Sequence, residues 1–180
     1  MTHSAPTLVA ERVTLRAFQV ADLPALAAIW ADPDVVHHLG GKPLSLEETW
    51  RKALGGVGQW ALFGFGYWVV ERNTDHSLVG HMGFADFQRG LDPAMYGAPE
   101  LGYVFAAAVH GQGIAREACA TALDWLGLRT SWAIISPANA PSIALAERLG
   151  YVSLGQRLYH DAPTLLLKRG SAPARKPKCR

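Results

Sequence analysis

A glycine-rich segment near the middle of the chain has the residue types of an anion-binding turn. It reads His110-Gly111-Gln112-Gly113-Ile114-Ala115, follows the extended apolar run 101–106 and leads into a helix-like segment. Glycines lack a Cβ, so the backbone can adopt unusual φ/ψ values and approach a ligand closely. The first free N–H groups of a helix, together with its dipole, favour phosphate oxygens. The segment therefore predicts a ligand that carries a pyrophosphate.

Two common phosphate motifs do not fit this turn. A dinucleotide fingerprint needs a third glycine where the chain has Arg116, and a P-loop needs Gly-Lys-Ser/Thr, which occurs nowhere in the sequence. One alternative left open is a nucleotide-binding protein that uses the same turn for ATP or NAD. Another is a plain packing turn between a strand and a helix.

The elements that position this turn follow from apolar periodicity and from start and stop residues. We expect strands over 13–17, 67–72, 78–84, 100–107, 132–135, 151–156 and 164–168, with the second and third forming a hairpin, and helices over 22–31, 45–54, 114–126 and 139–149. The second helix starts with the capping-box pattern Ser45-Leu46-Glu47-Glu48 and should end at Gly55-Gly56. The last is capped by Asn139 and ends at Gly150.

Two segments carry a family resemblance. The glycine turn resembles the coenzyme A turn of the GNAT N-acetyltransferases, Gln/Arg-x-x-Gly-x-Gly/Ala, although His110 departs from the first position. Asn139-Ala140-Pro141-Ser142, followed by Leu149-Gly150-Tyr151, looks like the family's Asn-x-x-Ser…Gly-Phe/Tyr segment. The order of elements, β-α-α-β-β-β-α-β-α-β-β, is also the one this fold uses. The resemblance spans about residues 11 to 169 and is greatest to the Rim-type ribosomal-protein N-acetyltransferase branch.

The resemblance implies an α/β GNAT fold, in which a mixed, mostly antiparallel sheet is splayed near the coenzyme site and carries helices on both faces. It also implies an acetyl-CoA-dependent N-acetyltransferase that needs no metal. The acetyl group would pass to a primary amine, either a protein N-terminus or a small molecule, by direct attack in a ternary complex. The alternative is a non-catalytic acyl-CoA-binding module that acts as a sensor or scaffold.

Site residues follow from the same resemblance. The backbone of Val104, Phe105 and Ala106 would bind the pantetheine arm, and the amides of His110, Gly111, Gln112, Gly113, Ile114 and Ala115 the pyrophosphate. Asn139 would contact the pantetheine arm, cap its helix, or do both, and Tyr151 would pack against the coenzyme or the core.

Two residues are candidates for catalysis. Ser142 would protonate the departing thiolate or, as the alternative, only satisfy local backbone. Glu100 would draw a proton from the amine through water, or be an exposed carboxylate at a strand end. Asp86 and His81 are candidates for the same role, and the amine could also react without a dedicated base.

Length and composition bound the remaining possibilities. With 180 residues, 49% hydrophobic and 18% charged, the chain fits a single domain over 1–169 with a basic, disordered tail over 170–180. Six basic and no acidic residues follow Leu167, so the remainder has 11 basic and 15 acidic residues and a net charge of −4, which suits a cationic amine. No apolar run approaches the roughly 20 residues that span a bilayer.

These features lead to several expectations about context. We expect a cytoplasmic monomer or homodimer that binds neither nucleic acid nor membrane. Cys119 should be a core residue, and the pair His37-His38 lacks the third ligand of a metal site. The acceptor pocket should form between the two early helices, their join Val35–Gly40 and the loop Gln88–Pro99. Most of the nearby aromatic side chains should belong to the core.

Overall fold

The computed structural model describes residues 4–170, in which the strands form one eight-stranded sheet. The spatial order is β1-β2-β3-β4-β5-β6-β8-β7. The strands are β1 (Leu8–Val9), β2 (Val13–Arg16), β3 (Tyr67–Arg72), β4 (Leu78–Ala85), β5 (Glu100–Phe105), β6 (Ser131–Ile135), β7 (Val152–Tyr159) and β8 (Ala162–Arg169). Every neighbouring pair is antiparallel except β5 and β6, which are parallel. The mixed, mostly antiparallel sheet is confirmed.

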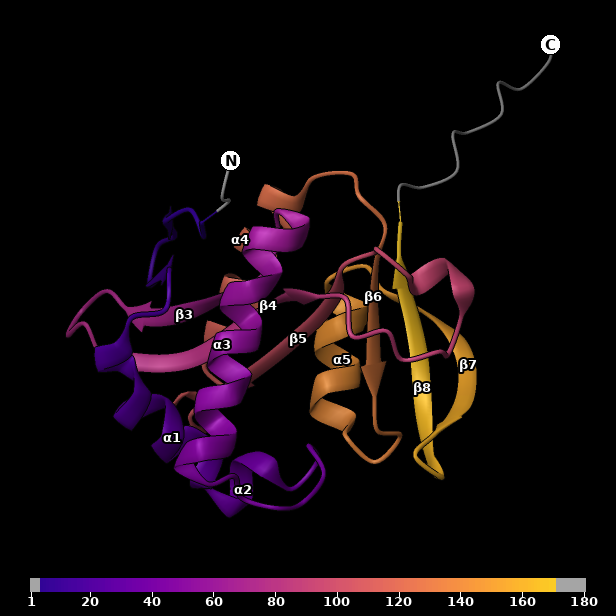
Figure 1. The fold of residues 1–180 in the computed structure, drawn as a ribbon, viewed down its shortest axis with the longest axis horizontal. Helices are drawn as coiled ribbons and strands as arrows, with labels where there is room; N and C mark the ends of the chain where they lie inside the picture. The colour runs from indigo at the N-terminus through magenta and orange to yellow at the C-terminus, as the bar shows by residue number, and fades with distance from the viewer. Residues whose placement is uncertain (1–3, 171–180) are drawn as a thin grey trace, which may run out of the picture.

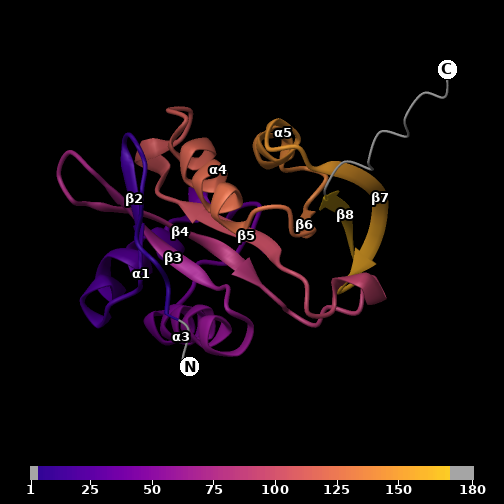
Figure 2. The ribbon, with the colours of Figure 1, turned by 90° about the horizontal axis from the view of Figure 1, so that it is seen from above.

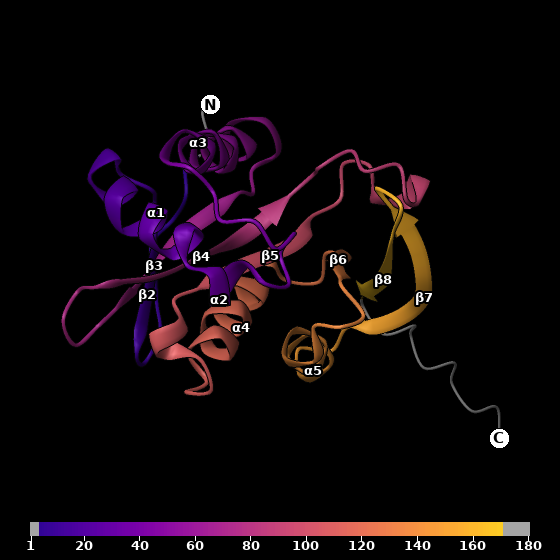
Figure 3. The same ribbon diagram turned by 90° about the horizontal axis from the view of Figure 1, so that it is seen from below.

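Helices cover both faces of this sheet (Figures 2 and 3). They are α1 (Leu23–Ala31), α2 (Pro33–Val36), α3 (Leu46–Phe63), α4 (Ile114–Leu126) and α5 (Ala140–Arg148). The helices α1 and α3 lie on one face, and α4 and α5 lie on the other. Three short 3₁₀ turns, 20–22, 93–95 and 107–109, join longer elements. The expected placement of helices on both faces is therefore confirmed.

The sheet opens between its two parallel strands. β5 and β6 are in register only at Glu100 and Trp132, where the Trp132 amide also donates to the Pro99 carbonyl at 2.9 Å. Beyond Glu100 the two strands diverge, so the rest of β5 has no neighbour on that side (Figure 1). An unpaired strand edge leaves backbone donors and acceptors available to a ligand. The splay expected near the coenzyme site is present.

A cluster of large aromatic side chains anchors the helices on the sheet. Trp60 of α3, Trp68 of β3 and Trp125 of α4 meet edge to face, with ring centroids 4.6 to 5.3 Å apart. Trp68 is fully buried and donates its indole N–H to the Pro6 carbonyl at 2.8 Å. Cys119 lies in the same core with no exposed surface, as the sequence predicted.

The predicted end of α3 is wrong. The helix passes through Gly55 and Gly56 and ends only at Gly64, whose φ of 70° is the left-handed geometry of a helix stop. Glycine in a helix interior costs only about 1 kcal/mol, and burial of Trp60 one turn later outweighs that cost. Gly56 also has a packing reason, because a Cβ at this position would lie 2.9 Å from Cβ of Tyr67.

Smaller differences concern short or irregular elements. The sequence reading missed β1 and α2, and it ended β7 three residues early, while the hairpin β3–β4 and helix α4 match their expected positions. Asp22 is the N-cap of α1 as expected, but its carboxylate makes no cap bond. It instead accepts two hydrogen bonds from Arg16, both at 2.8 Å. Except for Gly170, the predicted tail lies outside the described residues.

Candidate active site

The glycine turn has the backbone geometry that its sequence requires. Gly111 and Gly113 have φ values of 73° and 78°, a region that side chains with a Cβ rarely adopt. Gly113 is the N-cap of α4 and makes no side-chain cap bond. The turn therefore presents the bare N-terminus of a thirteen-residue helix at the end of β5.

Only some of the amides in this turn are available to a ligand. The His110 amide donates to the Ala107 carbonyl at 3.0 Å, and that of Gln112 points to the Val109 carbonyl at 3.4 Å. The first backbone bond into α4 comes from Glu117 to Gly113, at 3.1 Å. Within residues 4–170, no acceptor is present for the amides of Gly111, Gly113, Ile114, Ala115 and Arg116. These free N–H groups are the feature that fits a pyrophosphate.

Arg12 fastens this turn to the start of β2. Its backbone amide and Nε both donate to the Glu117 carboxylate at 2.6 Å, and Nη1 donates to the Gln112 carbonyl at 2.8 Å. Nη2 makes no hydrogen bond to a described residue and lies 3.3 Å from where a Cβ on Gly113 would be. Arg12 directly precedes the strand expected over 13–17, and nothing in the sequence indicates that it takes part in the turn. The structure places its guanidinium beside the free amides.

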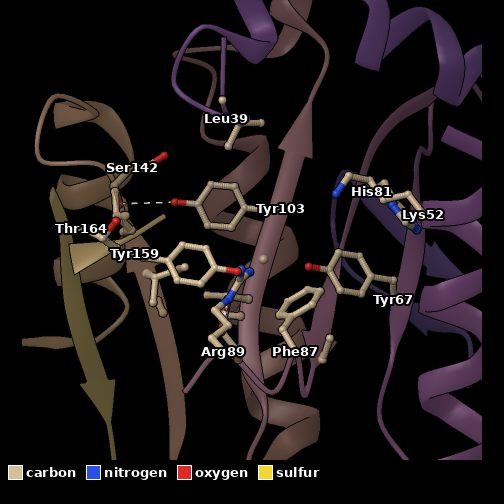
Figure 4. Close-up of a pocket in the computed structure, with 18 of the residues that line it drawn as sticks. Leu39, Lys52, Tyr67, His81, Phe87, Arg89, Tyr103, Ser142, Tyr159 and Thr164 are labelled. Atoms are coloured by element: carbon tan, nitrogen blue, oxygen red, sulfur yellow. Dashed lines mark hydrogen bonds and ion pairs between the residues drawn. The ribbon is translucent and has the colours of Figure 1, made fainter. Parts of the chain in front are cut away.

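A cavity of about 760 Å³ fills the opening between β5 and β6 and extends toward α1 and α3. Its polar and charged lining residues are Lys52, Gln59, Tyr67, His81, Arg89, Glu100, Tyr103, Asn139, Ser142, Tyr159, His160 and Thr164. Apolar walls come from Trp30, Leu39, Leu44, Phe87, Leu101 and Ile135, among others. The segments from which the sequence predicted an acceptor pocket contribute Trp30, Leu39, Gly40, Lys52 and Arg89. The side chains that meet in this space are shown in Figure 4.

Glu100 is a buried, paired carboxylate rather than an exposed one. Only 4% of its surface is exposed, and both of its oxygens accept from Nε of Arg89, at 3.0 and 2.9 Å. Burial raises the pKa of Glu100, and the Arg89 charge opposes that increase. Arg89 is itself fixed, since Nη1 donates to the Tyr159 hydroxyl at 2.9 Å and its guanidinium lies over the rings of Phe87 and Tyr159.

The other two base candidates have different surroundings. The Asp86 carboxylate accepts hydrogen bonds from the amides of Gln88 and Gly97 and from the Gln88 side chain, so it holds the loop that follows β4. His81 lines the cavity but is only 2% exposed. Burial, followed by the Lys52 charge, lowers the pKa of His81 to about 3, which makes it neutral at pH 7.

The start of α5 forms the other side of the cavity. Asn139 is the N-cap, and its Oδ1 accepts from the Ser142 amide at 3.2 Å, which confirms the capping prediction. The Ser142 hydroxyl makes no hydrogen bond to a described residue, while its carbonyl accepts from the Tyr103 hydroxyl at 3.4 Å. The Asn139 amide nitrogen and the Ser142 hydroxyl are thus both available on the cavity wall.

Tyr151 lies away from this wall. It is 3% exposed, belongs to the main core, and shares a 2.8 Å hydrogen bond with the Ser131 hydroxyl. Side chains of Val104 and Phe105 are also buried in core clusters, which leaves their backbone as the part a ligand can reach. Phe105 offers less than expected, because its carbonyl is already contacted by Nε2 of His110 at 3.0 Å.

Tyr67 is a cavity residue that the sequence did not distinguish from core aromatics. Its hydroxyl reaches across to β5 and lies where a Cβ on Gly102 would collide with it. Burial raises the pKa of Tyr67, so it stays protonated and can donate a hydrogen bond. Period-two patterning places Tyr67 and Val69 on one face of β3 but gives no sign of a cavity beside that face.

Neither a cluster of metal ligands nor a membrane-spanning helix is present among the described residues. Between Ser4 and Gly170, no three His, Cys, Asp or Glu side chains gather as metal ligands would. Rings of His37 and His38 lie edge to face, with centroids 4.6 Å apart. No helix in the same stretch has the length and apolar character needed to cross a membrane.

Comparisons with known proteins agree with this architecture. The acetyltransferase (GNAT) domain family matches residues 12–152. A relative from Bacillus licheniformis, the uncharacterized N-acetyltransferase p20, is 28% identical over 155 residues, covering 83% of this chain and 84% of its own. An acetyltransferase structure from Agrobacterium tumefaciens is 30% identical, with a TM-score of 0.79 over 95% of this chain and 98% of that one. A GNAT-family structure from Bordetella pertussis is 26% identical, with a TM-score of 0.82 over 92% and 100%.

More distant structures share the fold. A ribosomal-protein-serine acetyltransferase from Vibrio cholerae has 21% identity and a TM-score of 0.70 over 94% of this chain and 99% of that one. The aminoglycoside enzyme AAC(6')-Ib, in complex with ribostamycin and coenzyme A, has 18% identity and a TM-score of 0.72 over 89% and 94%. Because the family match covers most of the chain, the protein belongs to the GNAT acetyltransferase family and is an N-acetyltransferase.

Proposed function

We propose that this chain transfers an acetyl group from acetyl-CoA to a small primary amine by direct attack, with both substrates bound at once. The observation that carries the proposal is the continuity of three features. The free amides at the start of α4 follow β5, the open edge of β5 borders the gap to β6, and that gap opens into the 760 Å³ cavity. A site of this shape holds donor and acceptor together, which suits a ternary complex.

Backbone groups would hold the coenzyme. In this proposal the amides of Gly111, Gly113, Ile114 and Ala115 bind the pyrophosphate, and the outer nitrogen of Arg12 adds charge beside them. The edge of β5 that faces β6, near Val104 and Phe105, and the free amide nitrogen of Asn139 would hold the pantetheine arm. Ala106 fits this role less well than the sequence predicted, because its amide donates to the Val79 carbonyl at 2.9 Å and its carbonyl accepts from the Val109 amide at 3.0 Å. Tyr151 we assign to the core, because its hydroxyl is committed to Ser131.

Acetyl-CoA supplies the acetyl group as a thioester, and the protein must manage two protons. As the new N–C bond forms and the C–S bond breaks, the amine loses a proton and the sulfur gains one. In this proposal Glu100 accepts the proton of the amine through water, because its carboxylate lies in the cavity and burial raises its pKa. The second comes from the unpaired hydroxyl of Ser142, which later regains a proton from solvent.

Other bases fit less well. The Asp86 carboxylate already accepts hydrogen bonds from the amides of Gln88 and Gly97. A neutral His81 with a pKa of about 3 is a weak proton acceptor at pH 7. Glu100 is therefore the candidate base that both lines the cavity and has an elevated pKa. An acceptor that arrives already deprotonated would react without it, and that route predicts a small effect of replacing Glu100.

A thiol-release assay tests this proposal. Acetyl-CoA is offered with peptides, free amino acids, polyamines and aminoglycosides, and saturation by one class identifies the acceptor. Replacing both Glu100 by Gln and Ser142 by Ala should then reduce kcat by at least about 100-fold, the usual contribution of general acid-base groups. Unchanged turnover would remove both residues from the mechanism. Binding of acetyl-CoA without turnover of any amine would favour the sensor or scaffold.

A further inference from the structure

The lining of the cavity carries more positive than negative charge. Among its lining residues Lys52 and Arg89 are cationic and Glu100 alone is acidic. Glu100 is already bound to Nε of Arg89 at 2.9 Å. The carboxylate of Glu100 thus balances the guanidinium of Arg89, and the charge of Lys52 has no counter-charge among the lining residues.

Lys52 has no carboxylate partner within residues 4–170. Its Nζ lies 4.8 Å from the centroid of the Trp30 ring, which holds it at the cavity wall beside α1. Burial and the charge of Arg89 both lower the pKa of Lys52. An ammonium that is partly desolvated and faces a second cation gains from an anion placed between them.

Arg89 supplies a second unpartnered donor in this cavity. Nη2 of Arg89 makes no bond to a described residue, although Nε and Nη1 each have a partner. Arg89 is held in place by the Phe87 ring and by the ring and hydroxyl of Tyr159, so its free nitrogen is preorganised. A ligand group rich in acceptor oxygens complements this set.

We infer that the acceptor is a primary amine that also carries a carboxylate, as a free amino acid does, with Lys52 binding that carboxylate and the free nitrogen of Arg89 adding positive charge to the same cavity. The apolar walls of the cavity, including Trp30, Leu44 and Phe87, suit an acceptor with an apolar side chain. Polyamines and aminoglycosides would meet two cations there, and a peptide N-terminus would bring a neutral carbonyl instead of the anion. The inference rests on the proposed acetyl transfer and names its substrate class.

Matched acceptor pairs test it. Leucine, phenylalanine and methionine are compared with their carboxamides, which retain the amine and side chain but lack the charge. With the wild-type protein, kcat/KM should favour the acids by roughly tenfold or more, as expected for a charge-assisted hydrogen bond. Lys52→Met should lower this preference to about threefold or less, mainly through KM, because it leaves Arg89 in place. Arg51→Met removes a charge from the same helix, outside the cavity, and should retain the full preference.

A binding measurement gives a second readout that does not need turnover. By calorimetry on the CoA-saturated protein, N-acetyl-leucine should bind more tightly than its amide, and Lys52→Met should remove most of that difference. Equal use of acids and amides by the wild type, or a preference that is as large in Lys52→Met as in the wild type, overturns the inference and leaves acetyl transfer intact. Acetyl-CoA binding with no turnover of any amine, including peptides, overturns the proposed function instead.

Discussion

The buried pair Arg89–Glu100 allows a structural role of the carboxylate to be separated from a chemical one. Removing one member of a buried ion pair leaves the other uncompensated, at a cost of about 3 to 5 kcal/mol. Glu100 is 4% exposed and the Arg89 side chain 19%. We expect Glu100→Gln to fall at the lower end, about 3 kcal/mol, because the guanidinium keeps its contacts with the Phe87 ring and with the ring and hydroxyl of Tyr159.

Adding Arg89→Met completes a double-mutant cycle. Arg89→Met alone should also lower the free energy of unfolding by about 3 kcal/mol, whereas the double variant should lose clearly less than the sum, since no buried charge remains unpaired. Urea denaturation at pH 7 measures all four proteins. A loss below about 1 kcal/mol for both single variants would refute the buried pair as the source of stability.

The same four proteins report on chemistry. If Glu100 is the base, kcat falls by at least about 100-fold in Glu100→Gln and stays low in the double variant. Arg89→Met keeps the carboxylate but removes the cation that lowers its pKa, so the rise of kcat with pH should shift to higher pH. Activity that returns when Arg89→Met is added to Glu100→Gln would contradict the base assignment. It would mean that the carboxylate acts only by restraining the guanidinium.

Other predictions need single substitutions. Gly58→Ala should stabilise α3 by about 0.5 to 1 kcal/mol, since a Cβ there meets nothing within 4 Å. Gly56→Ala should destabilise the protein by about 1 to 3 kcal/mol, because the new Cβ would collide with Tyr67. Calorimetric unfolding compares the two variants. The pKa of His81 is about 3 in the folded protein, against 6.5 for an ordinary histidine. Below pH 6.5 the unfolded chain therefore binds a proton that the folded protein does not, and the free energy of unfolding falls as the pH falls. Going from pH 7 to 5, the wild type should therefore lose about 2 kcal/mol more than His81→Gln in urea denaturation. Arg12→Gln should raise KM for acetyl-CoA by about fivefold without changing kcat, and an unchanged KM would leave Arg12 a purely structural clamp.

Much of the donor side could be predicted from the sequence because backbone rules govern it. Two glycines with an intervening residue, preceded by a strand and followed by an amphipathic helix, already specify a turn with free amides. The structure gives Gly111 and Gly113 left-handed φ values and begins α4 at the expected residue. Which amides are free was less predictable. The His110 amide is not free, because it donates to the Ala107 carbonyl at the end of the 3₁₀ turn 107–109. Such short turns cannot be predicted from apolar periodicity.

Predictions failed where tertiary packing overrides a local signal. Gly55-Gly56 is a reasonable helix stop in isolation, yet α3 continues because Gly56 lets the helix approach Tyr67 and because Trp60 is buried beyond it. The pairing of Arg89 could not be predicted for a related reason, although its loop was expected at the acceptor pocket. Arg89 lies in an irregular loop, and its partners Glu100 and Tyr159 are 11 and 70 residues away along the chain. No spacing rule connects residues that only the folded sheet brings together.

The charge of the whole chain and the charge of the cavity lead to opposite expectations for the acceptor. The acidic body, with net charge −4 before Lys168, attracts cations at long range. At physiological salt that field is screened within about 8 Å. Inside the cavity, Lys52 and Arg89 lie among apolar walls such as Trp30 and Phe87, so their charges act with less screening than charges on the surface. Which acceptor remains bound is decided at that short range, and there an amine accompanied by a carboxylate is better matched than a polycation.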